Sequence, residues 1–398
     1  MYGCGRKCAC REDTIGLPRC HTGIGAAVYC RNHRIIFAAA LLIFALCPLG
    51  YCEEQAIIEA LELEPIVGYA GSQAFDFIAW MRFFIDGEGN PASDISELFS
   101  DVLHQAVNQL KNCIRAVLFP LLASSVLRFF VFKDGSVRRT ASFICRVCCI
   151  PALSASFVHL SEMTEQLLSN LLRCAELLSP VLIAAVSLSG ADASAVLLSP
   201  MMGACAQIIQ NLFTKWGIAL SCASVGLAIA GSLSSYIKLN RLHSLIRQIL
   251  HWGVGGVLTA FMAILTLQGR LAAGRDNAAA RTARYAIENL IPIIGGNVSD
   301  SLDSLLSTAN IVKNALGASG IVLLAYTCLS PLVRLFLHAL ILRLLSSISE
   351  PMGDENVTSL LSQFADGTEM LLITLAASVT LCCMLAGSCI SSAANFIH

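Results

Sequence analysis

The sequence predicts an all-α, multi-pass helical integral membrane protein, and three observations lead to that fold class. Of the 398 residues, 56% are hydrophobic and 13% are charged, and the charged share is about half that of a typical soluble domain. The shortage of charge is local, because apolar runs without Lys, Arg, Asp or Glu recur along the chain. Several of these runs approach the roughly 20 helical residues that a bilayer core of about 30 Å requires. The formal net charge of −1 argues against a nucleic-acid partner, which would need a basic face.

Residues 1–52 are predicted to form a basic, Cys-rich flank followed by a signal peptide or an uncleaved anchor. Six basic residues precede an apolar run of about 13 residues that begins at Ile35, and this order is typical of a secretory signal. The cysteines of the flank are spaced irregularly, unlike the paired CxxC steps of zinc sites. Most other cysteines lie within apolar runs, where Cys acts as a small hydrophobe. We therefore expect no metal site.

Residues 53–113 are predicted to form an extracytoplasmic amphipathic segment, because the basic flank stays inside. Between Ile95 and Leu110, apolar residues recur at helical spacing, which predicts a helix with one apolar face. That face would pack on the protein itself, on a partner or on the membrane surface. The remaining residues, 114–398, are the predicted polytopic membrane domain.

Loop charges set the predicted topology of this domain. Lys133–Arg139 and the segment from Lys238 to Arg247 are basic, so both are expected in the cytoplasm. A loop containing Glu162 and Glu165 is expected outside. Five acidic residues and no basic ones occupy residues 350–369, which leaves the orientation of the C-terminal part open. The predicted spans are 114–132, 141–160, 216–236, 249–268, 321–345 and 370–391.

Under this topology, the segment 175–215 must begin and end outside. Its two apolar halves are short, and Ser-Pro steps flank a centre of small residues. This pattern predicts a re-entrant or broken helix, because irregular backbone at membrane depth is tolerated only when protein buries it or when it lines water. The alternative is a pair of ordinary spans that uses small residues for close packing. The candidate pore or gating residues are Pro180, Ser187, Ser189, Gly190, Ser194 and Pro200.

Residues 269–317 are predicted to form an amphipathic, extracytoplasmic pair of helices that is broken near Pro292. Each helix carries one apolar stripe, and short helices are marginal in water without a packing partner. We expect the stripes to be buried against a second copy of the chain, as in a closed ring. The alternatives are the membrane face and a different, ring-forming partner. The candidate assembly residues are Arg281, Pro292, Gly295, Leu305, Leu306 and Lys313.

The sequence offers one weak enzyme motif. Gly317–Gly320 reads GASG, which matches the GxSG pattern around the nucleophile of rhomboid-type proteases. That chemistry needs a histidine on a neighbouring helix, whereas His338 follows Ser319 in the same apolar region. Close helix packing explains the small residues more simply. We therefore predict neither catalysis nor a cofactor.

Residues 268–320 carry four short steps in a specific combination. The steps are RTA at Arg281–Ala283, PxxG at Pro292–Gly295, SD at Ser299–Asp300 and VKNAxG at Val312–Gly317. This combination resembles the stage III sporulation protein AE family.

The resemblance covers roughly residues 95–398. It implies a membrane component of the transenvelope channel that joins mother cell and forespore during endospore formation, located in the mother-cell membrane that faces the forespore. The implied partners are other products of the same sporulation operon and a forespore docking protein. Two further function classes stay open on the residues alone. They are a small-solute transporter or permease, and a passive membrane scaffold.

Overall fold

The fold is all-α: in this computed structural model, every regular element among the described residues is a helix. The described residues are 63–73, 75–87, 100, 102–104, 107–108, 111, 135–233, 239–290, 295–350 and 355–391. The principal elements are α3 (Glu64–Ser72), α4 (Phe77–Asp86), α6 (Gly135–Leu188), α7 (Asp192–Gln207), the π-helix η1 (Ile208–Gly217), α8 (Ile218–Leu233), α9 (Asn240–Leu290), α10 (Gly295–Ser349) and α11 (Glu355–Ser391). The predicted flank 1–52, the span 114–132 and most of the helix at 95–110 lie outside the described residues.

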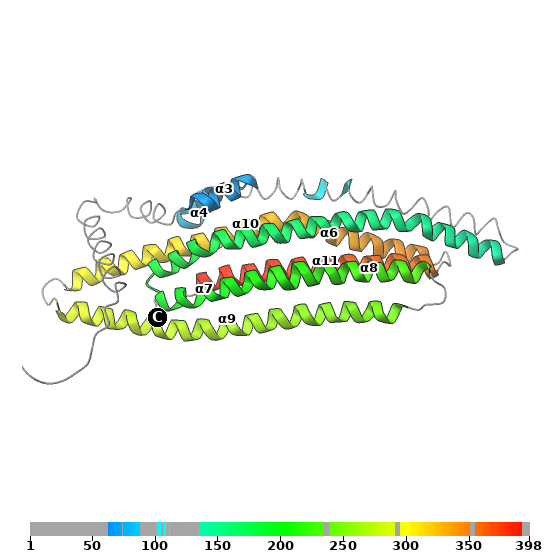
Figure 1. The fold of residues 1–398 in the computed structure, drawn as a ribbon. Coiled ribbons are helices and arrows are strands. Elements are labelled where there is room, and N and C mark those ends of the chain that lie inside the picture. The colour runs from blue at the N-terminus through cyan, green and yellow to red at the C-terminus, as the bar shows by residue number, and fades with distance from the viewer. Residues whose placement is uncertain are drawn as a thin grey trace, which may run out of the picture. The chain divides into compact units, whose positions relative to one another are not determined.

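Five helical stretches among the described residues are long and apolar enough to cross a membrane. They run side by side (Figure 1) and confirm the predicted class, an all-α multi-pass membrane protein. Each has 36 to 46 residues, so at 1.5 Å per residue each is roughly 54 to 69 Å long and extends beyond a hydrocarbon layer of about 30 Å. The stretches are Arg146–Leu188, Asp192–Leu233, Arg241–Asp276, Ser304–Ser349 and Asn356–Ser391.

Helix α6 and the continuous run α7–η1–α8 form an antiparallel hairpin. Near the open end, Arg146 donates a hydrogen bond to the carbonyl of Ser232 at 2.6 Å. Farther along, the Ser161 hydroxyl lies 3.7 Å from the Cys222 sulfur. The part of α6 around Arg146 therefore lies beside the last residues of α8.

The predicted loop at Glu162 and Glu165 is wrong, because α6 continues through both residues. Both glutamates are exposed, whereas Leu160 and Thr164 on the other side of the helix are fully buried. The acids thus belong to the polar face of one long amphipathic helix. Charge density alone suggested a loop, while tertiary packing of the opposite face keeps the helix intact.

The expected breaks at the Ser-Pro steps are also wrong. Pro180 and Pro200 both lie inside helices, as does Pro331 of α10. A proline removes one backbone donor and kinks a helix, but neighbouring helices can hold the chain on either side of it. The break predicted in the small-residue centre of segment 175–215 is present, at residues 189–191 between the end of α6 and the start of α7.

The predicted pair of helices at 269–317 continues two longer helices. Its first helix is the end of α9, and its second helix is the start of α10. The chain does break where expected, since α9 ends at Leu290 and α10 begins at Gly295. Pro292 lies outside the described residues.

Helices α10 and α11 form the most extensive contact of the bundle, and α11 lies at its centre. More than half of the apolar window of α11 is buried, against 17% for α9. Glycines allow close approach to α11. A Cβ at Gly217 would lie 2.6 Å from the Thr374 side chain, and one at Gly367 would lie 2.5 Å from Val225. Small residues of this kind are typical of helix contacts in membranes.

Helices α3 and α4 pack on α6 and α10. The Asp76 side chain caps α4 by accepting the Ala79 N–H at 3.0 Å. Phe75 packs against Tyr326 of α10 with ring centroids 5.2 Å apart. The Tyr69 hydroxyl donates to the Asn170 carbonyl at 3.1 Å, and burial raises the pKa of Tyr69 to about 12. Tyr69 therefore remains a hydrogen-bond donor at neutral pH.

Candidate functional site

A carboxylate from another helix holds the turn between α6 and α7. Asp276 of α9 is 3% exposed and accepts the backbone N–H groups of Ala193 at 2.9 Å and Ser194 at 3.2 Å. It also accepts the Ser194 hydroxyl at 2.5 Å. Residue Ala191, at the N-cap position of α7, makes no side-chain cap bond. Since the first N–H groups of a helix lack internal partners and carry partial positive charge, Asp276 serves as the cap of α7.

Four of the predicted pore or gating residues gather at this turn. Ser187 donates to the Asp192 carboxylate, and buried Ser189 donates to the Val186 carbonyl at 2.7 Å. Gly190 has a φ of +79°, in the left-handed region that favours glycine. The fourth, Ser194, binds Asp276. The other two, Pro180 and Pro200, lie within the flanking helices and away from the turn.

A small cavity of about 50 Å³ lies beside the turn, between α7, α9 and α11. Its lining is mostly apolar, with Ser194, Gln268 and Ser388 as the polar side chains. It is lined by Ser194, Leu197, Leu198, Met201, Leu265, Gln268, Gly269, Ala272 and Ser388.

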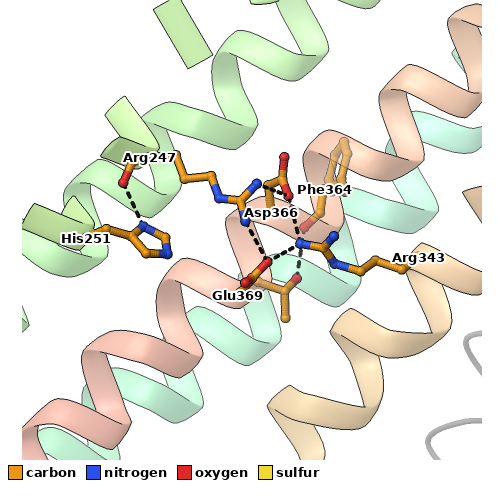
Figure 2. A network of polar contacts seen from close by, with 7 residues as sticks. Arg247, His251, Arg343, Phe364, Asp366 and Glu369 are labelled. Carbon is orange, nitrogen blue, oxygen red and sulfur yellow. Dashed lines mark hydrogen bonds and ion pairs between the residues drawn. The ribbon is translucent and has the colours of Figure 1, made fainter. Parts of the chain in front are cut away.

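A second polar site lies toward the opposite end of the bundle, where charged side chains connect three helices (Figure 2). Arg247 of α9 contacts Asp366 at 2.9 Å and Glu369 at 3.3 Å, both on α11. Arg343 of α10 contacts Asp366 at 3.2 Å and also binds Glu369. The nearby His251 Nδ1 lies 2.8 Å from the Arg247 carbonyl. Two positive and two negative groups therefore balance one another, and they tie α9, α10 and α11 together.

This charge network provides positive partners for two of the five acidic residues in segment 350–369. Its acids have no basic neighbours in the sequence, but Asp366 and Glu369 find Arg247 and Arg343 on other helices. The network lies on the side of the bundle where α8 ends and α9 begins. That is also the side where α6 begins, and the described parts of the two predicted basic loops are the first turns of α6 and α9.

Two of the remaining candidate residues are buried. Ser319, which is fully buried, donates to the Ala315 carbonyl of its own helix at 2.5 Å. Lys313 is also fully buried, so its assignment to an assembly surface is wrong. Its apolar stem and the stripe around it pack into the chain itself, which periodicity alone could not distinguish from packing on a partner.

The other predicted assembly residues are dispersed along α9 and α10. Arg281 lies in α9, and Gly295 is the first residue of α10. Leu305 and Leu306 are half-buried. A Cβ at Gly190 would lie 3.1 Å from the Leu306 side chain, so Leu306 packs on the turn of its own chain.

Comparison with known proteins identifies the family. The stage III sporulation protein AE family matches residues 75–393, which include all five candidate spans. The chain belongs to this family. The curated Stage III sporulation protein AE of Bacillus subtilis (strain 168) is 27% identical over 281 residues, 68% of each chain. No solved structure matches the chain.

Membership of the stage III sporulation protein AE family confirms the predicted resemblance and indicates a membrane protein with a role in sporulation. The VKNAxG step that suggested the family lies at the contact of α10 with α11. There the Lys313 Nζ lies 3.5 Å from the Ile390 carbonyl, and a Cβ at Gly317 would lie 2.6 Å from the Ile390 side chain. A lysine near the last carbonyls of a helix stabilises its C-terminus, so this step joins the start of α10 to the end of α11.

Proposed function

We propose that this chain is a membrane subunit of the transenvelope channel that joins mother cell and forespore during endospore formation. The observation that carries the proposal is the family match over residues 75–393. The proposed location is the mother-cell membrane that faces the forespore. The proposed partners are other products of the stage III sporulation operon, a forespore docking protein and further copies of this chain.

The structure supports a subunit held rigidly at two levels. The Asp276 cap fixes the turn at one end of the bundle, and the charge network joins three helices nearer the other end. Buried polar groups that are fully paired favour one arrangement of helices. A rigid bundle suits a component that must align with partners across two membranes.

The proposal is tested by deleting the gene in its own host and restoring it on a plasmid. We expect loss of heat-resistant spores on deletion and recovery on complementation. An affinity-tagged copy should co-purify other products of the sporulation operon from membranes harvested after engulfment. Normal spore counts in the deletion strain would contradict the proposal. Defective spores without any such co-purification would instead support a scaffold or a permease.

The turn between α6 and α7 allows a test of a conducting role. Single cysteines at Ser187 and at the buried Ser189 should differ in reaction with a water-soluble thiol reagent, because only a hydrated thiol forms the reactive thiolate. If the turn opens to a water-filled passage in the assembled complex, Ser189→Cys should gain reactivity when the partner proteins are present. Unchanged protection would assign the turn a purely structural role.

A further inference from the structure

The exposed side of the α6–η1 hairpin carries a run of polar side chains over several helical turns, beside exposed apolar ones such as Val158 and Trp216, which are 52% and 66% exposed. On α6, the exposed side chains include four charged ones, namely Glu162, Glu165, Arg173 and Glu176. On α7 and η1, the exposed side chains include three amides and one ammonium group, namely Gln207, Gln210, Asn211 and Lys215. The π-helical geometry spans most of this second stripe.

Neighbouring helices are apolar at the same depth. Gly217, two residues after Lys215, packs on Thr374 of α11, and α11 carries no charged residue from Met370 to Ser391. The outer face of α9 presents Trp252 and Met262, 76% and 47% exposed. At this depth the bundle therefore has one side suited to lipid and another that is not.

Hydrocarbon is a poor neighbour for the polar stripe. Ionised residues within membrane segments are costly and almost always face protein or water. Within the part of the chain that the structure describes, Glu165, Arg173 and Glu176 form no ion pair through their side chains. Lys215 donates to Asn211 of its own helix at 3.1 Å.

The two stripes complement each other by depth. Since α6 and α7 are antiparallel about the turn at 189–191, residues equally distant from the turn lie at one level, as the contact of Ser161 with Cys222 illustrates. Three polar pairs match within three residues of each other, or about 4.5 Å along a helix. They are Glu176 with Gln207, Arg173 with Gln210, and Glu165 with Lys215. Each pair combines a donor with an acceptor.

We propose that this face binds the same face of a second copy of the chain, related by a two-fold axis parallel to the helices. Copies inserted with one orientation keep equal depths, so Glu165 of one copy meets Lys215 of the other, and the reverse contact follows from the symmetry. Such reciprocal contacts define an isologous interface. The inference rests on the proposed role as a membrane subunit and adds the surface through which the subunits pair.

Disulfide trapping between two differently tagged copies tests the interface. One copy carries Glu165→Cys and the other Lys215→Cys, both in a background with the exposed Cys148 and Cys222 replaced by serine. Both are co-expressed in a host that does not sporulate, and the membranes are oxidised. We expect a cross-linked product that carries both tags. The matched control pairs Glu165→Cys with Met262→Cys on the outer face of α9, which should give little product.

Charge reversal provides a second readout that does not depend on cysteine. Glu165→Lys or Lys215→Glu should each lower the dimer fraction in mild detergent by about fivefold to tenfold, since contacting charges couple strongly. The double variant should restore the dimer. Absence of cross-linking above the control, in protein shown to be inserted, would overturn the proposal. Rapid labelling of both cysteines by a charged maleimide, in protein that forms no dimer, would also overturn the proposal. That result would show that the face contacts water. Because no sporulation is involved, this failure is distinct from failure of complementation.

Discussion

The two polar sites of the bundle both place carboxylates between helices, but they neutralise the negative charge in different ways. In the charge network, two arginines face two carboxylates, and the Arg343 side chain is 51% exposed. At the α6–α7 turn, a single carboxylate that is 3% exposed faces backbone N–H groups and one hydroxyl. The first site depends on net charge balance near water. The second depends on the partial charge of a helix N-terminus in a dry environment. Burial, more than the number of charges, should decide how much each site contributes to stability.

The largest effect is expected for Asp276→Ala. The change leaves two N–H groups and the Ser194 hydroxyl without their acceptor, which should cost about 2–3 kcal/mol. The midpoint of thermal unfolding in detergent measures this. Asp192→Ala is the matched control, because Asp192 is an exposed acid in the first turn of the same helix. Equal losses of stability in the two variants would contradict the prediction that the buried acid contributes more than the exposed one.

The second effect is expected for Asp366→Ala in the charge network. Asp366 is 14% exposed and contacts both arginines, so its loss leaves both guanidinium groups with Glu369 as their one remaining carboxylate in the network. We expect a destabilisation of about 1–2 kcal/mol, below that for a fully buried pair. Exposed Glu350 provides the control for removing an acid. A loss larger than that of Asp276→Ala would show that charge balance outweighs burial in this bundle.

A smaller effect is expected for Ser194→Ala. The change removes one hydroxyl donor from Asp276 while both backbone N–H groups continue to bind, so the loss should be about 1 kcal/mol. The comparison variant is Ser187→Ala, whose hydroxyl binds the exposed Asp192 and should matter less. If the two serines are equivalent, the turn is not held through Asp276.

The smallest effect is expected for Arg343→Gln. Half of this side chain is exposed, and exposed ion pairs contribute only a few tenths of a kcal/mol. The same change at Arg247, whose side chain is 34% exposed, should be more damaging. High salt should reduce the difference between wild type and the Arg343 variant, because ions screen exposed charges. It should leave the Asp276→Ala loss unchanged, and a salt-dependent loss there would contradict the buried cap.

Several features of the fold could be predicted because they depend on local composition. Apolar runs predicted the helical membrane class, and the small residues around Gly190 predicted the break between α6 and α7. The break near Pro292 was likewise predicted from Pro and Gly, which disfavour a continuous helix. Conversely, the Ser-Pro steps at Pro180 and Pro200 predicted breaks that are absent, since neighbouring helices stabilise a helix through a proline.

Tertiary structure determined the lengths of the helices and which surface each apolar stripe packs against. Whether Glu162 lies in a loop or on a helix face depends on the burial of residues on the other side of α6. Likewise, Lys313 belongs to a stripe that could have packed on any apolar surface, and its contact with Ile390 arises only from the register of α10 and α11.

Composition therefore determined that this chain enters a membrane as helices, because the hydrophobic effect and helix propensity act over short windows. The polar sites could not be found in the same way. Asp276 lies 82 residues from Ser194, and Arg247 lies 119 residues from Asp366. No periodicity links residues so far apart. Their pairing follows from the packing of α9 against α7 and α11, since a buried carboxylate is stable only where the folded chain supplies donors.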